Sequence, residues 1–188
     1  TAPARSSVRD RLSLIAGTGA LVTEVIAMAR KRGFELQVLS ATPRRFPAGV
    51  SVVPIDPAAP RPALDAVRAF GATMLAMIGS VTLADRDREA LGRFAGADGL
   101  AAGDTAVSRL AEAFERHTGA RLVGIHEIAP ELLAPHGPIA GPALSAEMME
   151  SATFAVRLAR AAGRLDLGQA VVVSGRRAVA LEDISGTD

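Results

Sequence analysis

Short apolar runs alternate with stretches of helical periodicity in the N-terminal half of the chain. Residues 12–16 form an apolar run that ends at a Gly-Thr-Gly turn, and apolar residues then recur at helical spacing from Leu21 to Ala29. Further apolar runs lie at residues 36–39, 50–55 and 74–78. Residues 62–70 predict a helix with a proline near its start and a glycine beyond its end. Strands that alternate with helices predict an α/β fold with a parallel sheet.

A stretch rich in proline and glycine separates this pattern from the rest of the chain. Residues 130–142 hold four prolines and two glycines, which is typical of a loop or a domain junction. We therefore expect an N-terminal domain over residues 1–134 and a smaller α+β domain over residues 135–188. The other predicted elements are a helix that Asp104 caps and Gly119 ends, a strand at 121–125, a helix at 146–162 capped by Ser145, and a β-hairpin with strands at 170–173 and 178–181.

Composition narrows the classes of function. Of the 188 residues, 49% are hydrophobic and 22% are charged, which indicates a folded globular protein. The absence of cysteine excludes disulfides and thiolate chemistry. A formal charge of +1, with no tryptophan or tyrosine, argues against nucleic acid as a partner. The longest uncharged central run, residues 69–84, contains two glycines and is too short to span a bilayer comfortably.

The Gly-Thr-Gly turn at residues 17–19 lies between the first strand and the first helix, where nucleotide phosphates bind in many α/β proteins. The dinucleotide fingerprint is incomplete, because Val22 replaces its third glycine and no acidic residue ends the second strand. A tight turn that needs small residues explains the glycines equally well. A less favoured interpretation is an NADP-dependent oxidoreductase in which Arg44 and Arg45 hold the 2′-phosphate.

Acidic residues gather at the C-terminal end of the sequence. Residues 182–188 read Glu-Asp-Ile-Ser-Gly-Thr-Asp and place three carboxylates and two hydroxyls after the hairpin. Such a group suits a hard divalent cation and, through it, a diphosphate, although acidic chain ends are commonly just solvated. The histidines lack zinc-ligand spacing. His126, followed by Glu127 at an expected strand end, either meets a ligand or bonds to the backbone.

Six segments occur in an order that resembles one known family. They are Leu14 to Leu21, Met77 to Val81, Gly103 to Thr105, Leu122 to Glu127, Leu167 to Val173 and Glu182 to Asp188. Together they resemble the UDP-2,3-diacylglucosamine pyrophosphatases of lipid A synthesis. The resemblance implies a metal-dependent hydrolase with a Rossmann-like N-terminal domain and a distinct C-terminal domain, which bind the lipid nucleotide between them. It also implies that water attacks the α-phosphorus and that UMP and 2,3-diacylglucosamine 1-phosphate are released.

The resemblance also implies which residues form the site. Asp188 and Glu182 are expected to bind Mg²⁺ or Mn²⁺ and to activate water, which makes them the catalytic candidates. The expected substrate contacts are Gly17, Thr18, Gly19, Gly79, Ser80, Asp104, His126, Pro142, Ser145 and Gln169. The family pattern differs at two positions, with lysine in place of Ser80 and aspartate in place of Thr105. Because the family continues beyond the Gly-Thr-Asp motif, we expect the C-terminal domain to be incomplete here.

The expected partners follow from the same resemblance. A UDP-diacylglucosamine-like lipid nucleotide is the expected substrate, and its acyl chains imply transient contact with the inner membrane from a cytoplasmic location, without an anchoring helix. A homodimer is left open. The alternative is a binding or regulatory relative that keeps a nucleotide or lipid site but lacks catalysis.

Overall fold

The computed structural model describes residues 10–96, 104–165, 167–168 and 170–182, and the chain divides into two compact units. The first unit comprises residues 1–96 and 110–133, and the second comprises residues 97–109 and 134–188. Within the described ranges, no helix combines the length and apolar character needed to cross a membrane.

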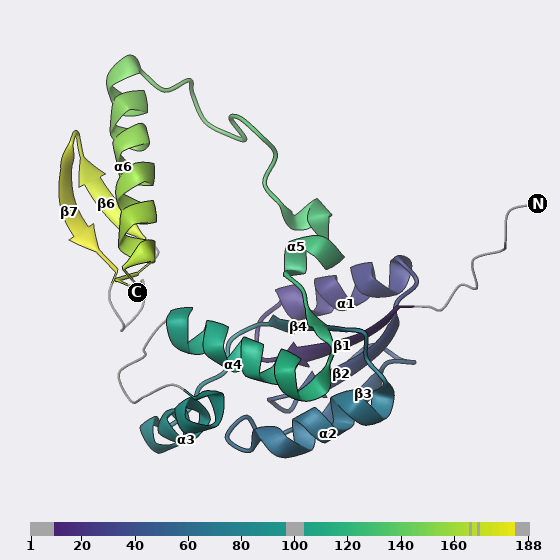
Figure 1. Cartoon of the computed structure of the whole chain (residues 1–188). Coiled ribbons are helices and arrows are strands. Elements are labelled where there is room, and N and C mark those ends of the chain that lie inside the picture. The colour runs from purple at the N-terminus through teal and green to yellow at the C-terminus, as the bar shows by residue number, and fades with distance from the viewer. Residues whose placement is uncertain (1–9, 97–103, 166, 169, 183–188) are drawn as a thin grey trace, which may run out of the picture. The chain divides into compact units, whose positions relative to one another are not determined.

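The first unit is built on a five-stranded parallel sheet (Figure 1). Its strands are β1 (Arg11–Ala16), β2 (Glu35–Ser40), β3 (Ser51–Pro54), β4 (Met74–Ile78) and β5 (Arg121–Leu122). Their order across the sheet is β3-β2-β1-β4-β5, and every neighbouring pair is parallel. This confirms the predicted α/β fold with a Rossmann-like parallel sheet, with β1 at its centre.

Helices cover both faces of the sheet (Figure 1). They are α1 (Leu21–Lys31), α2 (Pro60–Phe70), α3 (Asp85–Ala95), α4 (Asp104–Thr118) and α5 (Ile125–Ile128). Successive strand residues point to opposite faces, so Leu14 and Val38 pack in the cluster with α1 and α5, whereas Leu39 and Leu75 pack in the cluster with α2 and Phe114 of α4. Each fully buried Leu or Val contributes roughly 1.5–3 kcal/mol, which makes these two layers the main source of stability.

Two elements of the first unit differ from the sequence prediction. Strand β5 has two residues rather than the five expected at 121–125, and the chain turns into α5 at Ile125. The side chain of Glu127 accepts a hydrogen bond from the Gly124 amide at 3.0 Å and so stabilises the helix start. Helix α3 was not predicted, because six of its eleven residues are charged. Its inner face is nevertheless apolar, with Leu91 and Ala95 buried.

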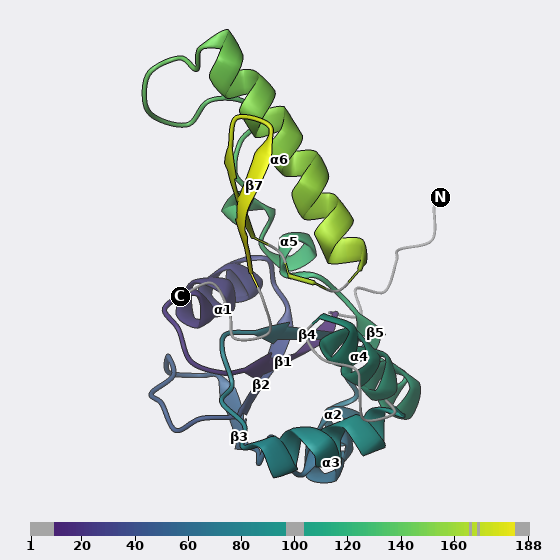
Figure 2. The ribbon, with the colours of Figure 1, turned by 90° about the vertical axis from the view of Figure 1, so that its left-hand side faces the viewer.

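The second unit contains the long helix α6 (Ala146–Arg164) and an antiparallel hairpin of β6 (Val171–Ser174) and β7 (Arg177–Leu181). The hairpin lies along α6 in both views (Figures 1 and 2). The Ser145 hydroxyl accepts a hydrogen bond from the Met148 amide at 3.2 Å, which confirms the predicted cap. Helix α6 continues two residues past the predicted end, through Gly163 to Arg164. In the predicted loop before α6, residues 130–132 form a short 3₁₀ helix that belongs to the first unit.

Candidate functional site

The strand order places a change of direction at the centre of the sheet. From β1 the chain moves to β2 and β3 on one side, and it then returns to β4 on the other side of β1. Ligands of open α/β sheets bind at such a point, outside the carboxyl ends of the strands. The turn at residues 17–20 follows β1, and Gly79 and Ser80 follow β4. Five of the residues expected to contact substrate therefore lie together at this position, which we call the switch-point turn (residues 17–20, 79 and 80).

Hydrogen bonds join the two halves of the switch-point turn. The Thr18 amide donates to the Ser80 carbonyl at 2.8 Å, and the Ser80 amide donates to the Thr18 carbonyl at 3.1 Å. The Thr18 hydroxyl also donates to the Ser80 carbonyl at 3.1 Å. In addition, the Gly17 amide donates to the Ile78 carbonyl at 2.9 Å. The amides of Gly17 and Thr18 are thus used within the protein and are not free to bind a phosphate.

Two glycines are required by the closeness of these segments. A Cβ atom at Gly17 would overlap the Ser80 carbonyl oxygen, and one at Gly79 would overlap the Thr18 carbonyl oxygen. Gly79 also has a φ of 85°, which favours glycine. Gly17 therefore serves a tight turn, one of the two interpretations that the sequence left open for residues 17–19, and Gly79 serves the same close approach.

Arg44 holds the β1–α1 turn from the loop after β2. Its guanidinium donates to the carbonyls of Gly17 and Gly19 at 3.3 Å and 3.1 Å, and to the Thr23 hydroxyl at 3.0 Å. It also lies 5.5 Å from the centre of the Phe46 ring. The sequence singled out Arg44 only as a partner for a 2′-phosphate. Its role in the turn depends on a contact between residues that are distant in sequence. The one available signal was that the second strand, which Arg44 follows, was expected beside the first strand, which the turn follows.

The start of α1 leaves backbone donors beside this cation. Ala20 caps the helix without a side-chain hydrogen bond, and Glu24 is the acidic residue of the first turn. Among the described residues, none accepts a hydrogen bond from the amides of residues 19–22. Unpaired amides at a helix start attract anions, and the Arg44 guanidinium adds a positive charge to the same turn. The arrangement can therefore bind a phosphate oxygen.

His126 lies on α5, not at a strand end as the sequence predicted. Its exposed imidazole is folded back against Gly124, at the same carboxyl edge of the sheet as the switch-point turn. The neighbouring Glu127 forms an ion pair with Arg121 at 2.9 Å. This bond, together with the one from the Gly124 amide, lowers the pKa of the Glu127 carboxyl below its usual range. Glu127 is therefore held as a carboxylate that organises α5, and His126 remains available to solvent.

The remaining expected site residues belong to the second unit or lie outside the described residues. Ser145 caps α6, and Pro142 is exposed in the segment before it. Asp104 is the first residue of α4, and the side chain of Asp104 is not among those that the structure describes. Gln169 and Asp188 lie outside the described residues. These residues keep their expected roles as predictions.

Glu182, the other expected metal ligand, closes the base of the hairpin. Its Oε2 atom accepts a hydrogen bond from the Ala170 amide at 2.8 Å, and its own amide donates to the Ala170 carbonyl at 3.0 Å. The described part of the chain contains no group of three or more His, Asp or Glu side chains placed to hold a metal ion. Because Asp188, the other expected ligand, lies outside the described residues, the expected cation site stays a prediction.

Comparisons with known proteins place the chain in a family. The family model for the LpxI N-terminal domain matches residues 11–132, and the model for the LpxI C-terminal domain matches residues 135–188. The chain belongs to the LpxI family. A relative from Caulobacter vibrioides named UDP-2,3-diacylglucosamine pyrophosphatase LpxI is 34% identical over 85 residues. That match spans 45% of this LpxI chain but only 30% of the relative.

Solved structures of two enzymes are also similar to part of this chain. UDP-glucose 4-epimerase from Thermus thermophilus, in complex with NAD, is 21% identical with a TM-score of 0.42, over 60% of this chain and 36% of the epimerase. WbmG from Bordetella bronchiseptica, in complex with NAD and UDP, is 20% identical with a TM-score of 0.43, over 64% of this chain and 38% of WbmG.

Proposed function

We propose that this LpxI chain takes part in the hydrolysis of UDP-2,3-diacylglucosamine to UMP and 2,3-diacylglucosamine 1-phosphate, a step of lipid A synthesis. The observation that carries the proposal is the match of both LpxI domain models, which together account for residues 11–132 and 135–188. The name of the Caulobacter vibrioides relative supplies the substrate and the reaction type. In this reaction water attacks the α-phosphorus, the bond from that phosphorus to the bridging oxygen breaks, and the sugar phosphate leaves.

The switch-point turn supports a role in holding the nucleotide phosphates. The amides at the start of α1 point a positive dipole end toward the carboxyl edge of the sheet, and Arg44 adds a guanidinium at the same turn. The Thr18–Ser80 bridge fixes both glycine-containing segments, so the donors need little reorganisation when a phosphate binds. His126, at the same edge, is a second candidate contact.

Substituting Thr18 with valine tests this role. Thr18→Val removes the hydroxyl bond to the Ser80 carbonyl. As a control, Thr73→Val removes two hydroxyl bonds at the amino end of β4, one to the Arg11 carbonyl and one from the Arg11 amide. We expect Thr18→Val to weaken UMP binding about threefold to tenfold in calorimetry, because one neutral hydrogen bond contributes about 0.5–1.5 kcal/mol. Equal weakening in the two variants would remove the switch-point turn from the nucleotide site.

Dependence on Mg²⁺ or Mn²⁺, with Asp188 and Glu182 as ligands and as the groups that activate water, is a further part of the proposal. When bound, such a cation would offset diphosphate charge and lower the pKa of a bound water. Incubation with UDP-2,3-diacylglucosamine should release UMP, and EDTA should abolish the release until Mg²⁺ or Mn²⁺ is restored. Asp188→Ala should eliminate it, whereas Glu147→Gln, which removes one exposed carboxylate from α6, should not.

The structural and metal-binding roles of Glu182 are separable by two substitutions. Glu182→Gln keeps an oxygen that accepts the bond from the Ala170 amide but loses the charge, whereas Glu182→Ala loses both. If Glu182 holds a cation, both variants should lose UMP release. If it only closes the hairpin, Glu182→Gln should keep full activity and the melting temperature of the wild-type chain.

A binding module without catalysis is the second candidate, favoured by Ser80 and Thr105, where the family pattern has lysine and aspartate. Calorimetry that shows affinity for UMP or for 2,3-diacylglucosamine 1-phosphate without turnover would support it. Two further experiments address the finer proposals on partners and location. Flotation with lipid vesicles tests transient contact with the inner membrane from the cytoplasm, and light scattering tests a homodimer.

A further inference from the structure

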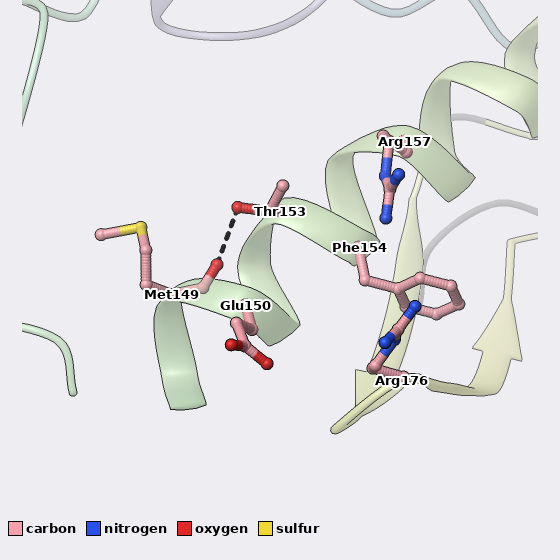
Figure 3. Close-up of a pocket in the computed structure, with 6 residues that line it drawn as sticks. All are labelled: Met149, Glu150, Thr153, Phe154, Arg157 and Arg176. Carbon is pink, nitrogen blue, oxygen red and sulfur yellow. Dashed lines mark hydrogen bonds between the residues drawn. The ribbon is translucent and has the colours of Figure 1, made fainter. Parts of the chain in front are cut away.

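A pocket of about 310 Å³ lies within the second unit, between α6 and the turn of the hairpin (Figure 3). Its lining residues are Met149, Glu150, Thr153, Phe154, Arg157 and Arg176. Five of them lie between residues 149 and 157 of α6, and Arg176 comes from the two-residue turn between β6 and β7. The pocket is therefore formed inside one unit and needs no contribution from the sheet domain.

Two cations in this pocket have no partner among the residues that the structure describes. Within the described residues, Arg157 and Arg176 make neither a hydrogen bond nor an ion pair, whereas Arg32 and Arg121 of the first unit are each paired with a carboxylate. Figure 3 shows Arg157 on α6 and Arg176 on the hairpin turn, both among the residues that line the pocket. Two like charges near one another repel unless an anion lies between them. Arginine is also the residue whose planar donors best match phosphate oxygens.

Two of the other lining residues, Met149 and Phe154, are apolar. The Phe154 ring is half-buried, and Met149, earlier on α6, is 54% exposed. The Thr153 hydroxyl donates to the Met149 carbonyl at 2.8 Å, so its proton is not offered to a ligand. The pocket thus combines two arginines with two apolar side chains, a combination that suits a phosphate carried by an apolar group.

Glu150 is the one acidic group in the pocket, and it opposes an anion. Figure 3 shows its carboxylate turned away from both arginines, and it forms no ion pair with either within the described residues. Two cations against one carboxylate leave a net positive charge, which favours an anionic ligand over a cation. Because the Glu150 carboxylate repels an anion, removing it should strengthen the binding of a phosphate.

We propose that Arg157 and Arg176 form a phosphate-binding pocket on the second unit. The site is independent of the proposed hydrolysis, because it needs neither the switch-point turn nor Asp188. Its ligand chemistry has two sources, a lipid phosphate and a free phosphate. All the charged groups involved are exposed, so binding should weaken steeply as salt is raised.

Titration of the whole chain, followed by NMR of the arginine Nε signals, tests the site directly. The probes are inorganic phosphate, dihexanoyl phosphatidic acid and, as the zwitterionic control, dihexanoyl phosphatidylcholine. We expect the first two to shift the signals of Arg157 and Arg176 but not that of Arg160, an exposed arginine on the same helix that does not line the pocket. Tighter binding of phosphatidic acid than of inorganic phosphate identifies a lipid phosphate as the source, and equal binding identifies free phosphate.

Variants give the second readout. The double variant Arg157→Gln/Arg176→Gln should bind phosphatidic acid about tenfold more weakly, because charged hydrogen bonds to phosphate are lost. Arg160→Gln, which removes one charge from the same helix outside the pocket, should change binding less than about twofold, and Glu150→Gln should strengthen it about twofold. Absence of shifts at both pocket arginines, equal binding of phosphatidylcholine, or an equal loss in Arg160→Gln would overturn the proposal. The shifts in the wild-type chain decide the matter even if the double variant does not fold.

Discussion

Gly79→Ala is the substitution that most directly probes how the switch-point turn is built. The added Cβ would overlap the Thr18 carbonyl oxygen and would lie 3.0 Å from Cγ2 of Val22 and 3.1 Å from the Gly17 carbonyl carbon. The obstructing atoms are mostly backbone and cannot rotate away. Gly33→Ala is a matched control, because Gly33 has a φ of 84° against 85° at Gly79 but has nothing within 4 Å of an added Cβ.

The expected free-energy losses follow from this difference. Forcing alanine into the left-handed region costs roughly 1–2 kcal/mol at either glycine. At Gly79 the overlap also separates Thr18 from Ser80, which are joined by three hydrogen bonds of 2.8–3.1 Å. At about 0.5–1.5 kcal/mol per bond, their loss adds roughly 1.5–4.5 kcal/mol. Gly79→Ala should therefore destabilise the first unit by about 3 kcal/mol more than Gly33→Ala.

Urea unfolding followed by far-ultraviolet circular dichroism measures the two losses in the free energy of unfolding. Hydrogen exchange locates the effect, since the Thr18 and Ser80 amides should exchange faster in Gly79→Ala and at an unchanged rate in Gly33→Ala. If the two variants lose the same stability, or if both amides stay protected in Gly79→Ala, then steric closeness does not hold the turn together.

Three other expectations concern packing, capping and ionisation. Leu14→Ala, in the buried centre of β1, should lower the free energy of unfolding by about 2–5 kcal/mol in urea titration, and a loss under about 1 kcal/mol would contradict the core assignment. Ser145→Ala should cost about 1 kcal/mol and shorten α6, read as a loss of helical circular dichroism, whereas Ser145→Asp should keep the cap. The depressed pKa of Glu127 contributes stability that is present above the pKa of the unfolded chain and is lost as pH falls through the folded value; carboxyl NMR should show this pKa rising in Arg121→Gln, and an unchanged value would contradict the assigned cause.

The sequence predicted the parallel sheet because its strands are apolar runs with clear boundaries. Met74–Ile78 is a strand with the bounds expected from its apolar residues, since it is covered on both faces. Helix α3 escaped prediction because its inner face needs only Leu91 and Ala95 beside many charges. The start of α5 depends on the reach of Glu127 back to Gly124, a local bond that competes with the strand propensity of residues 121–125.

The candidate site was predictable as far as it follows from strand order. Glycines after the first and fourth strands meet because both strands end at the same edge of a parallel sheet, beside the change of direction. The hydrogen bonds from Arg44 to the β1–α1 turn were not predicted, and neither was the pocket at Arg157 and Arg176. Each depends on side chains that packing brings together from separate elements. Periodicity carries no signal for such contacts.

The proposed reaction has its most direct test in the position of the oxygen that water adds. The chain is incubated with UDP-2,3-diacylglucosamine in ¹⁸O-labelled water with Mg²⁺ or Mn²⁺, and the products are analysed by mass spectrometry. Attack on the α-phosphorus predicts that UMP carries the label and that 2,3-diacylglucosamine 1-phosphate does not. Label in the sugar phosphate would contradict the position of attack, and a chain that releases no UMP with either metal would contradict the proposed hydrolysis.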